Sequence, residues 1–204
     1  MEKRTQTGFT LYELLVTMLI VGVVLTLGIP NLSEFTRNSR ITSTANDLHA
    51  SFLMARSEAA RAKTNITICA SPILKEVPNP RTCTGTWDDG YVVFVDDNFN
   101  LDIDGDDSIL RAHPTVDEGV TLVVDFDATY FMFSATGLGR QNDVFDTALS
   151  RVIICDQRGV VETSKDFSAG RLLVVTPLGR ATVIRDFTMV DAALPDLTTA
   201  DTCP

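Results

Sequence analysis

One apolar run near the N-terminus constrains this chain more than any other feature. Residues 8–30 read GFTLYELLVTMLIVGVVLTLGIP, and their only charged side chain is Glu13. Lys3 and Arg4 precede the run, and the next charge after it is Glu34. A helix of about 20 apolar residues spans the roughly 30 Å hydrocarbon core of a bilayer. The run therefore predicts a long apolar helix that crosses a membrane.

Three interpretations of the run compete. A secretory signal peptide needs a small-residue cleavage site after its apolar core, and residues 25–35, LTLGIPNLSEF, offer none. A plain membrane anchor does not explain Glu13, because an unpaired charge in a membrane costs several kcal/mol. Cleavage before the run would instead leave Phe9 as the new N-terminus. Its α-amine, a cation at neutral pH, could then pair with Glu13 of the same chain or of a neighbour.

The third interpretation matches a known signal. Gly8-Phe9-Thr10-Leu11 followed by Glu13 resembles the type IV prepilin signal, GFTLxE. The resemblance implies that residues 1–8 are a leader peptide and that a prepilin peptidase cleaves between Gly8 and Phe9. It also implies N-methylation of the new Phe9 amine and an assembly salt bridge made by Glu13. The alternative is a Glu13 that reaches the membrane surface alone, which would not require assembly.

Composition and cysteines limit what the rest of the chain can be. The 204 residues carry a net charge of −10, which argues against nonspecific binding to DNA or to an anionic membrane surface. The four cysteines contain no CxxC pair, so neither a zinc ribbon nor a thioredoxin-type site is indicated. Outside the cytoplasm disulfides persist. Of the three possible pairings we favour Cys69–Cys83 and Cys155–Cys203, since each joins a predicted strand to a loop or tail. Four buried free thiols are the alternative.

The chain after the run changes from helical to strand patterning. Apolar residues recur near helical spacing at Phe35, Ile41, Ala45, Leu48, Phe52, Ala55 and Ala59. We expect one helix from about Phe9 to Ala62, apolar all round over 9–35 and amphipathic over 36–62. Strands are predicted at 65–70, 91–96, 120–126, 129–134, 151–156, 171–177 and 180–186.

Helix first and strands after predict an α+β fold, in which an antiparallel sheet packs on the second half of the helix. The predicted organisation is a leader at 1–8, a transmembrane or filament-core helix at 9–35 and a periplasmic globular domain at 36–204. Within that domain, a β domain covers 65–186 and a C-terminal tail covers 187–204.

Residues 38–71 narrow the resemblance to the GspH/FimT group of minor pilins. The matching features are Asn38 and Arg40, Ala45-Asn46-x-Leu48, Ala55-Arg56-Ser57-Glu58-Ala59, Cys83, Trp87, Gly90, VVFVD at 92–96 and residues 107–122. The ARSEA stretch and the Cys–Cys–Trp spacing resemble FimT and FimU of type IV pili more than GspH of type II secretion.

The resemblance implies a type IV pilin-like fold and a non-enzymatic role. It implies a single-pass protein of the bacterial inner membrane that later enters a pilus or pseudopilus filament. The implied partners are other minor pilins, the major pilin and prepilin peptidase, and the implied role is to initiate or prime pilus assembly. A GspH-like pseudopilin of type II secretion is the alternative, as is a DNA-binding minor pilin for natural transformation.

Two further patterns are weaker. Asn100, Asp102, Asp104 and Asp106, with Gly105, resemble the first half of a calcium loop. Asn100 and Arg111 depart from that pattern, so a solvated acidic loop without a cofactor is the favoured interpretation. Gly179-Arg180-Ala181-Thr182 matches only half of the GRxR motif of FimT-like DNA receptors, because Thr182 replaces the second arginine. DNA is therefore an unlikely partner, and Arg180 is the only candidate contact.

Enzyme chemistry has little support in the sequence. The chain has two histidines, His49 and His113, and we expect both to serve packing or the surface. It contains no phosphate loop, nucleophile elbow or zincin motif.

Overall fold

The structure is a computed structural model that describes residues 8–72, 83–105, 107–125, 128–140, 149–163, 166–194 and 203, except for the side chains of residues 27, 30 and 31. The chain divides into two compact units, residues 1–39 and 40–204.

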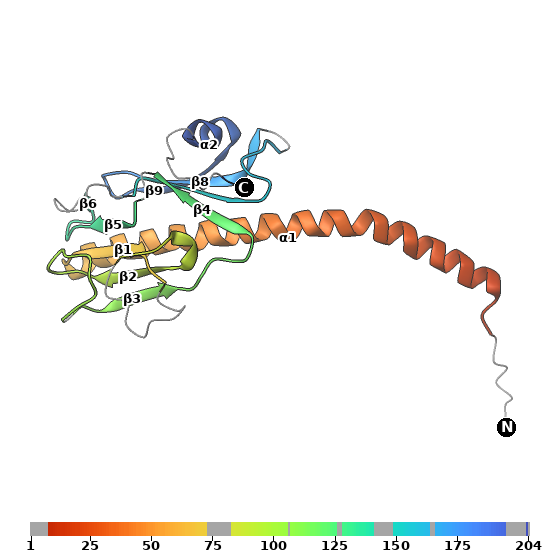
Figure 1. Cartoon of the computed structure of the whole chain (residues 1–204), viewed down its shortest axis with the longest axis horizontal. Helices are drawn as coiled ribbons and strands as arrows, with labels where there is room; N and C mark the ends of the chain where they lie inside the picture. The colour runs from red at the N-terminus through yellow and green to blue at the C-terminus, as the bar shows by residue number, and fades with distance from the viewer. Residues whose placement is uncertain are drawn as a thin grey trace, which may run out of the picture. The chain divides into compact units, whose positions relative to one another are not determined.

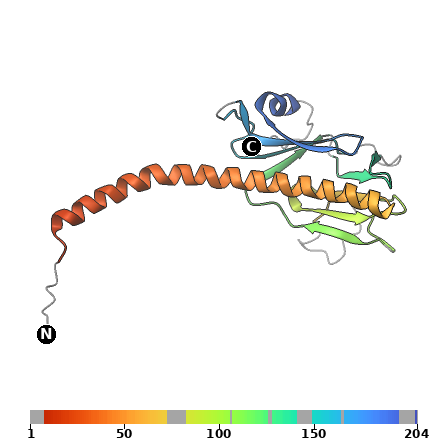
Figure 2. The same cartoon turned by 180° about the vertical axis from the view of Figure 1, so that it is seen from behind.

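The first long element is α1 (Leu11–Ala62), a helix of 52 residues (Figures 1 and 2). The helix continues through Gly22, Gly28 and Pro30. The large apolar side chains of residues 9–35 for which the structure gives an exposure are exposed, from 37% at Val16 to 84% at Phe9. Within the parts of the chain that the structure describes, no helix combines the length and hydropathy that crossing a membrane needs.

The second unit holds two antiparallel sheets (Figure 1). The five-stranded sheet has the order β3-β2-β1-β5-β6, built from β1 (Ile66–Ala70), β2 (Tyr91–Val95), β3 (Ile109–His113), β5 (Tyr130–Phe133) and β6 (Gly139–Arg140). The four-stranded sheet has the order β4-β7-β8-β9, built from β4 (Val120–Val124), β7 (Arg151–Asp156), β8 (Phe167–Val175) and β9 (Ala181–Asp186). A 3-10 turn, η1 (Trp87–Asp89), and a short helix, α2 (Phe187–Ala193), complete the unit.

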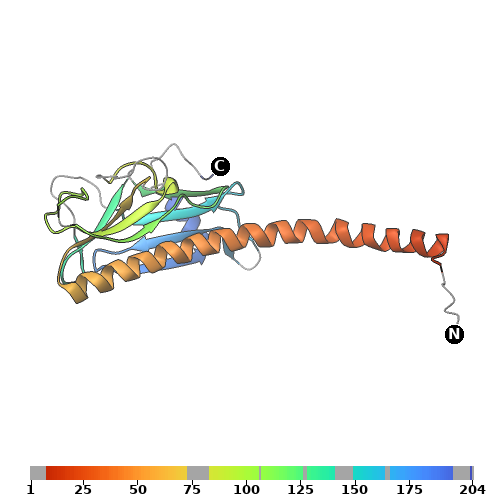
Figure 3. The same ribbon diagram turned by 90° about the horizontal axis from the view of Figure 1, so that it is seen from below.

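The core forms where residues 41–59 of α1 meet both sheets (Figure 3). The buried helix positions are Ile41, Ala45, Leu48, Phe52, Ala55 and Ala59, each at most 1% exposed. Phe52 contacts Phe131 and Phe133 edge to face, with ring centroids 5.7 and 6.4 Å apart. Such aromatic pairs add to the free energy gained by burying apolar area. The predicted apolar stripe is thus correct from Ile41 onward, whereas Phe35 is 70% exposed.

The α+β fold class is confirmed, with three corrections to its details. The strands form two sheets where one was expected. β3 and the two-residue β6 were not predicted, since the ILRAH residues of β3 lack regular alternation of buried and exposed side chains and β6 is too short to show any. The predicted tail 187–204 begins with α2, whose seven residues are too few to show a helical period. The sequence signal for α2 is its N-cap residue, Asp186. The Asp186 carboxylate accepts a hydrogen bond from the Met189 N–H at 3.1 Å.

Candidate functional site

The start of α1 is a capping box made by Thr10 and Glu13. The Thr10 N–H and hydroxyl both donate to Glu13 Oε2, at 2.9 and 2.8 Å, and the Glu13 N–H donates to Thr10 Oγ1 at 3.3 Å. This reciprocal pairing satisfies backbone N–H groups that the first turn of a helix leaves unbonded. The T-x-x-E spacing at 10–13 is the sequence signal for it, and our sequence analysis overlooked it.

The residues of the predicted prepilin signal lie exposed at the start of α1. Gly8 and Phe9 directly precede Thr10, and Phe9 is 84% exposed. No atom of the described residues lies within 4 Å of the position that a Cβ on Gly8 would occupy. In the single chain, Glu13 is held by Thr10 and remains exposed. Its predicted salt bridge to an α-amine, and the predicted cleavage and methylation, stay predictions of the sequence.

Two disulfides join the pairs that the sequence analysis favours. Cys69 on β1 is bonded to Cys83, with Cα atoms 5.4 Å apart, and Cys155 on β7 is bonded to Cys203, with Cα atoms 5.9 Å apart. Each bond ties a buried strand to chain that lies outside the strands. Cys203 packs against the small core beneath α2.

The acidic loop at 96–107 is held by hydrogen bonds between its own residues. The Asn98 and Asn100 amides donate to the two oxygens of Asp104 at 3.3 and 2.8 Å, and the Asp102 N–H donates to Asn100 Oδ1 at 2.8 Å. Asp106 lies outside the described residues. Among the residues that are described, no group of three or more His, Cys, Asp or Glu side chains is placed to hold a metal ion. The calcium hypothesis therefore stays a prediction from the sequence.

Asp96 is a buried carboxylate at the base of this loop. It is 0% exposed and accepts hydrogen bonds from Thr67 Oγ1 at 2.9 Å and from the Asn100 N–H at 3.2 Å. Burial raises the pKa of Asp96 above its usual value, and these hydrogen bonds oppose the rise. Asp96 therefore stabilises the loop from inside the unit, away from solvent.

Arg180, the candidate DNA contact, lies at a turn that Gly179 makes possible. The turn joins β8 to β9, and the Arg180 side chain is exposed. Gly179 has a φ of +72°, and a Cβ there would lie 2.4 Å from the Gly137 carbonyl oxygen. The Arg56 Nε on α1 donates to that same oxygen at 3.1 Å. The glycine of the half-matched motif thus has a structural role, and so does the arginine of the ARSEA stretch.

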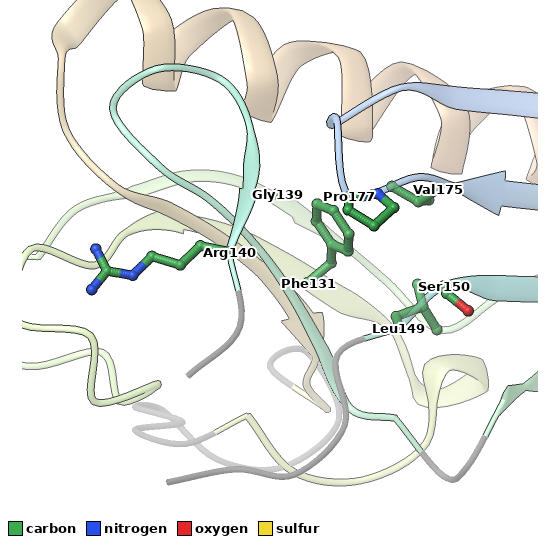
Figure 4. A pocket seen from close by; sticks show the side chains of 7 residues that line it. All are labelled: Phe131, Gly139, Arg140, Leu149, Ser150, Val175 and Pro177. Carbon is green, nitrogen blue, oxygen red and sulfur yellow. The ribbon is translucent and has the colours of Figure 1, made fainter. Parts of the chain in front are cut away.

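A mainly apolar hollow of about 310 Å³ lies beside this turn (Figure 4). It is lined by Phe131, Gly139, Arg140, Leu149, Ser150, Val175 and Pro177. The Arg140 guanidinium lies 4.0 Å from the centroid of the Phe99 ring, so it is already engaged at the rim.

The two histidines contact neighbouring groups of the second unit. The His113 ring stacks on Tyr91 with centroids 4.7 Å apart, and His49 Nε2 lies 3.3 Å from the Ala181 carbonyl oxygen. Both rings are therefore engaged in structural contacts.

Comparison with known proteins gives two family matches and two similar solved structures. The family described as type II transport protein GspH matches residues 44–185, and the prokaryotic N-terminal methylation motif matches residues 3–29. Two crystal forms of the type IV minor pilin FimU of Pseudomonas aeruginosa are similar, each with 23% sequence identity. Their TM-scores are 0.47 and 0.44, and the matches cover 74% and 70% of this chain and 92% and 91% of FimU. No curated protein matches the chain significantly.

Proposed function

The chain belongs to the GspH family of minor pilins and pseudopilins, and we propose that it is a minor pilin that helps to prime assembly of a type IV pilus. Before assembly, the proposed minor pilin is anchored in the inner membrane by residues 9–35, with residues 36–204 in the periplasm. It then joins other minor pilins and the major pilin in the filament. The observation that carries the proposal is that one chain has both a GspH match and a methylation motif.

Features of the first unit support the proposed anchoring and assembly. Its exposed apolar side chains include Leu15, Leu19, Val24 and Ile29, which are 61%, 68%, 62% and 62% exposed. Contiguous apolar surface on this scale marks a protein or membrane interaction site. Removing residues 1–8 would free the Phe9 amine one residue before Thr10. Glu13 would then have a cation close by, because Thr10 already holds its carboxylate at the helix start.

Replacing Gly8 tests the processing step. Gly8→Leu places a branched side chain at the predicted cleavage site, and we expect uncleaved protein, an unmethylated Phe9 and loss of piliation. Intact mass and N-terminal sequencing of the purified chain measure the cleavage. Thr5→Leu, which changes the leader away from the predicted bond, is the matched control and should be processed normally. Normal cleavage and piliation of the Gly8 variant would refute the proposal.

A pseudopilin of a type II secretion system is the second candidate. The description of the matching family, type II transport protein GspH, favours it. The ARSEA stretch, which resembles FimT and FimU, favours the pilus. Deletion of the coding sequence decides between them, because a pilus component should be needed for twitching and a secretion component for release of exoproteins.

A further inference from the structure

Two hairpin turns with the same hydrogen-bonding pattern lie side by side in the second unit. One joins β5 to β6, and its Gly137 N–H donates to the Ser134 carbonyl oxygen at 2.8 Å. The other joins β8 to β9, and its Gly179 N–H donates to the Thr176 carbonyl oxygen at 2.8 Å. Both glycines have a left-handed φ, of +75° and +72°. The two sheets thus meet at a pair of matched turns.

A hydrogen bond between the turns brings two exposed leucines together. The Gly139 N–H donates to the Pro177 carbonyl oxygen at 2.9 Å. Leu138 directly precedes this glycine and Leu178 directly follows this proline, so the two leucines are the neighbours of one hydrogen bond. Their side chains are 44% and 68% exposed. Exposed apolar side chains that lie together mark an interaction site, whereas single scattered ones do not.

The mainly apolar hollow of about 310 Å³ adjoins the same hydrogen bond. Gly139 and Pro177 both line it, and Figure 4 shows the Phe131 ring facing Pro177. The Ser150 hydroxyl in its lining donates to the buried carboxylate of Asp125, so this polar group is already bonded. Pockets that bind small molecules have volumes of about 300 to 1,000 Å³. The hollow is at the lower end of that range and suits a large apolar side chain.

The two hairpins that carry these turns contain no acidic residue. Residues 128–140 and 167–185 hold none of the 27 aspartates and glutamates of the chain. Arg140 and Arg180 end the two turns and are exposed. Within the described parts of the chain neither forms an ion pair, and Arg140 instead lies over the Phe99 ring. The turns therefore present apolar side chains with a positive rim, in a chain whose net charge is −10.

We propose that the paired turns, meaning Leu138, Leu178, Arg140 and Arg180 with the adjoining hollow, dock an acidic segment of a different pilin-family subunit. A large apolar side chain of that segment packs on the two leucines, and carboxylates beside it pair with the two arginines. Complementary charge favours this occupant, because opposite charges across an interface select the partner and set its register. Duplex DNA could meet the arginines, but its phosphates offer nothing to cover the leucines. The inference deepens the proposed function, on which it rests, by naming the surface that selects a partner.

Site-specific photocrosslinking of the full chain in living cells tests the docking. p-Benzoylphenylalanine replaces Leu138, and the peptide that it captures on irradiation is sequenced by mass spectrometry. We expect a peptide of another pilin-family subunit in which Asp or Glu lies beside a large apolar residue. Leu178→Asp should lower the yield about tenfold, since burial of a large apolar side chain is lost. Met189→Asp replaces another exposed apolar side chain, 55% exposed on α2, and should leave the yield unchanged.

A charge swap tests the role of the arginine. Arg180→Glu should lose the crosslink, and changing the carboxylate of the captured segment to lysine should restore it. A variant that merely failed to fold would not be rescued by a change in its partner. Capture of a segment without acidic residues, of a second copy of this chain, of another part of the same chain or of DNA overturns the proposal. The absence of any crosslink also overturns it.

Failure of the proposed function would look different. Capture of an acidic segment of a type II secretion pseudopilin would keep the paired turns as a docking surface and would refute the role in a pilus. Loss of twitching on deletion of the coding sequence, together with no crosslink from position 138, would keep the pilus role and overturn the docking surface.

Discussion

At the scale of single residues, Asp96 has the most informative titration. Because its pKa is raised in the folded state, the folded chain binds this proton more tightly than the unfolded chain does. Stability contributed by Asp96 is therefore highest below the ordinary aspartate value near 3.9 and falls as the pH rises through the raised pKa. Asp186 has the opposite sign, since hydrogen bonds from the Thr188 hydroxyl and then from the Met189 N–H lower its pKa, and its contribution is lost as the pH falls.

Replacing Asp96 should remove its contribution to the dependence of stability on pH. Asp96→Asn keeps an oxygen acceptor for the Asn100 N–H but cannot ionise, so we expect a flatter dependence of thermal stability on pH above about 4. Differential scanning calorimetry between pH 4 and neutral pH measures it. Asp97→Asn, an exposed neighbour, controls for the loss of one acidic charge. An unchanged slope in Asp96→Asn would show that the carboxylate is as well solvated in the folded chain as in the unfolded chain.

At the scale of elements, the Gly137 carbonyl oxygen links α1 to the turns at Gly137 and Gly179. The Gly137 oxygen accepts the Arg56 Nε–H and leaves no room for a side chain on Gly179. The turn that carries Arg180 therefore depends on a helix residue more than a hundred positions away. This contact explains a glycine and an arginine that the sequence suggested only through family resemblance.

A methyl group at Gly179 should destabilise the folded chain. We expect Gly179→Ala to lower the free energy of unfolding by about 3 kcal/mol, the upper end for a strained left-handed residue, because steric overlap adds to the unfavourable φ. Gly119→Ala is the control, since Gly119 has a φ of +83° but a Cβ there would meet no atom of the described residues within 4 Å. It should cost about 1 kcal/mol. Urea denaturation measures both, and equal losses would show that the overlap at Gly179 is relieved by a small backbone shift.

At the scale of the whole molecule, the distribution of charge argues against binding of duplex DNA. Residues 88–127 hold twelve acidic side chains and one basic residue, Arg111. Arg180 precedes β9 and Arg185 lies near the other end of that strand, so they cannot reinforce one another at a single phosphate. A single phosphate contact gives weak, salt-sensitive binding.

We therefore predict negligible binding of duplex DNA to residues 36–204. The dissociation constant should exceed the range of about 10⁻⁶ to 10⁻⁴ M that is typical of nonspecific binders. A gel shift at roughly 0.15 M salt is the measurement. A clear micromolar complex that disappears in Arg180→Ala would contradict the prediction and would move DNA uptake ahead of pilus priming.

Local chemistry allowed much of this protein to be predicted from its sequence. The run at 8–30, the stripe from Ile41 to Ala59 and the strand at 151–156 each depend on the order of apolar and polar residues within one segment, which the sequence displays directly. The same holds for the prepilin-like signal at Gly8, Phe9 and Glu13. The capping box of Thr10 could also have been found this way.

Tertiary structure alone decided which distant segments meet. Nothing in the order of residues indicated that the strands would divide between two sheets, or that ILRAH at 109–113 would add an edge strand, because pairing depends on contacts across the fold. Arg56 reaching Gly137 is such a contact, and so is the buried Arg171 of β8 reaching Thr42 on α1. A buried cation is recognised only when its surroundings are known, since burial and the charges of distant neighbours set its energy.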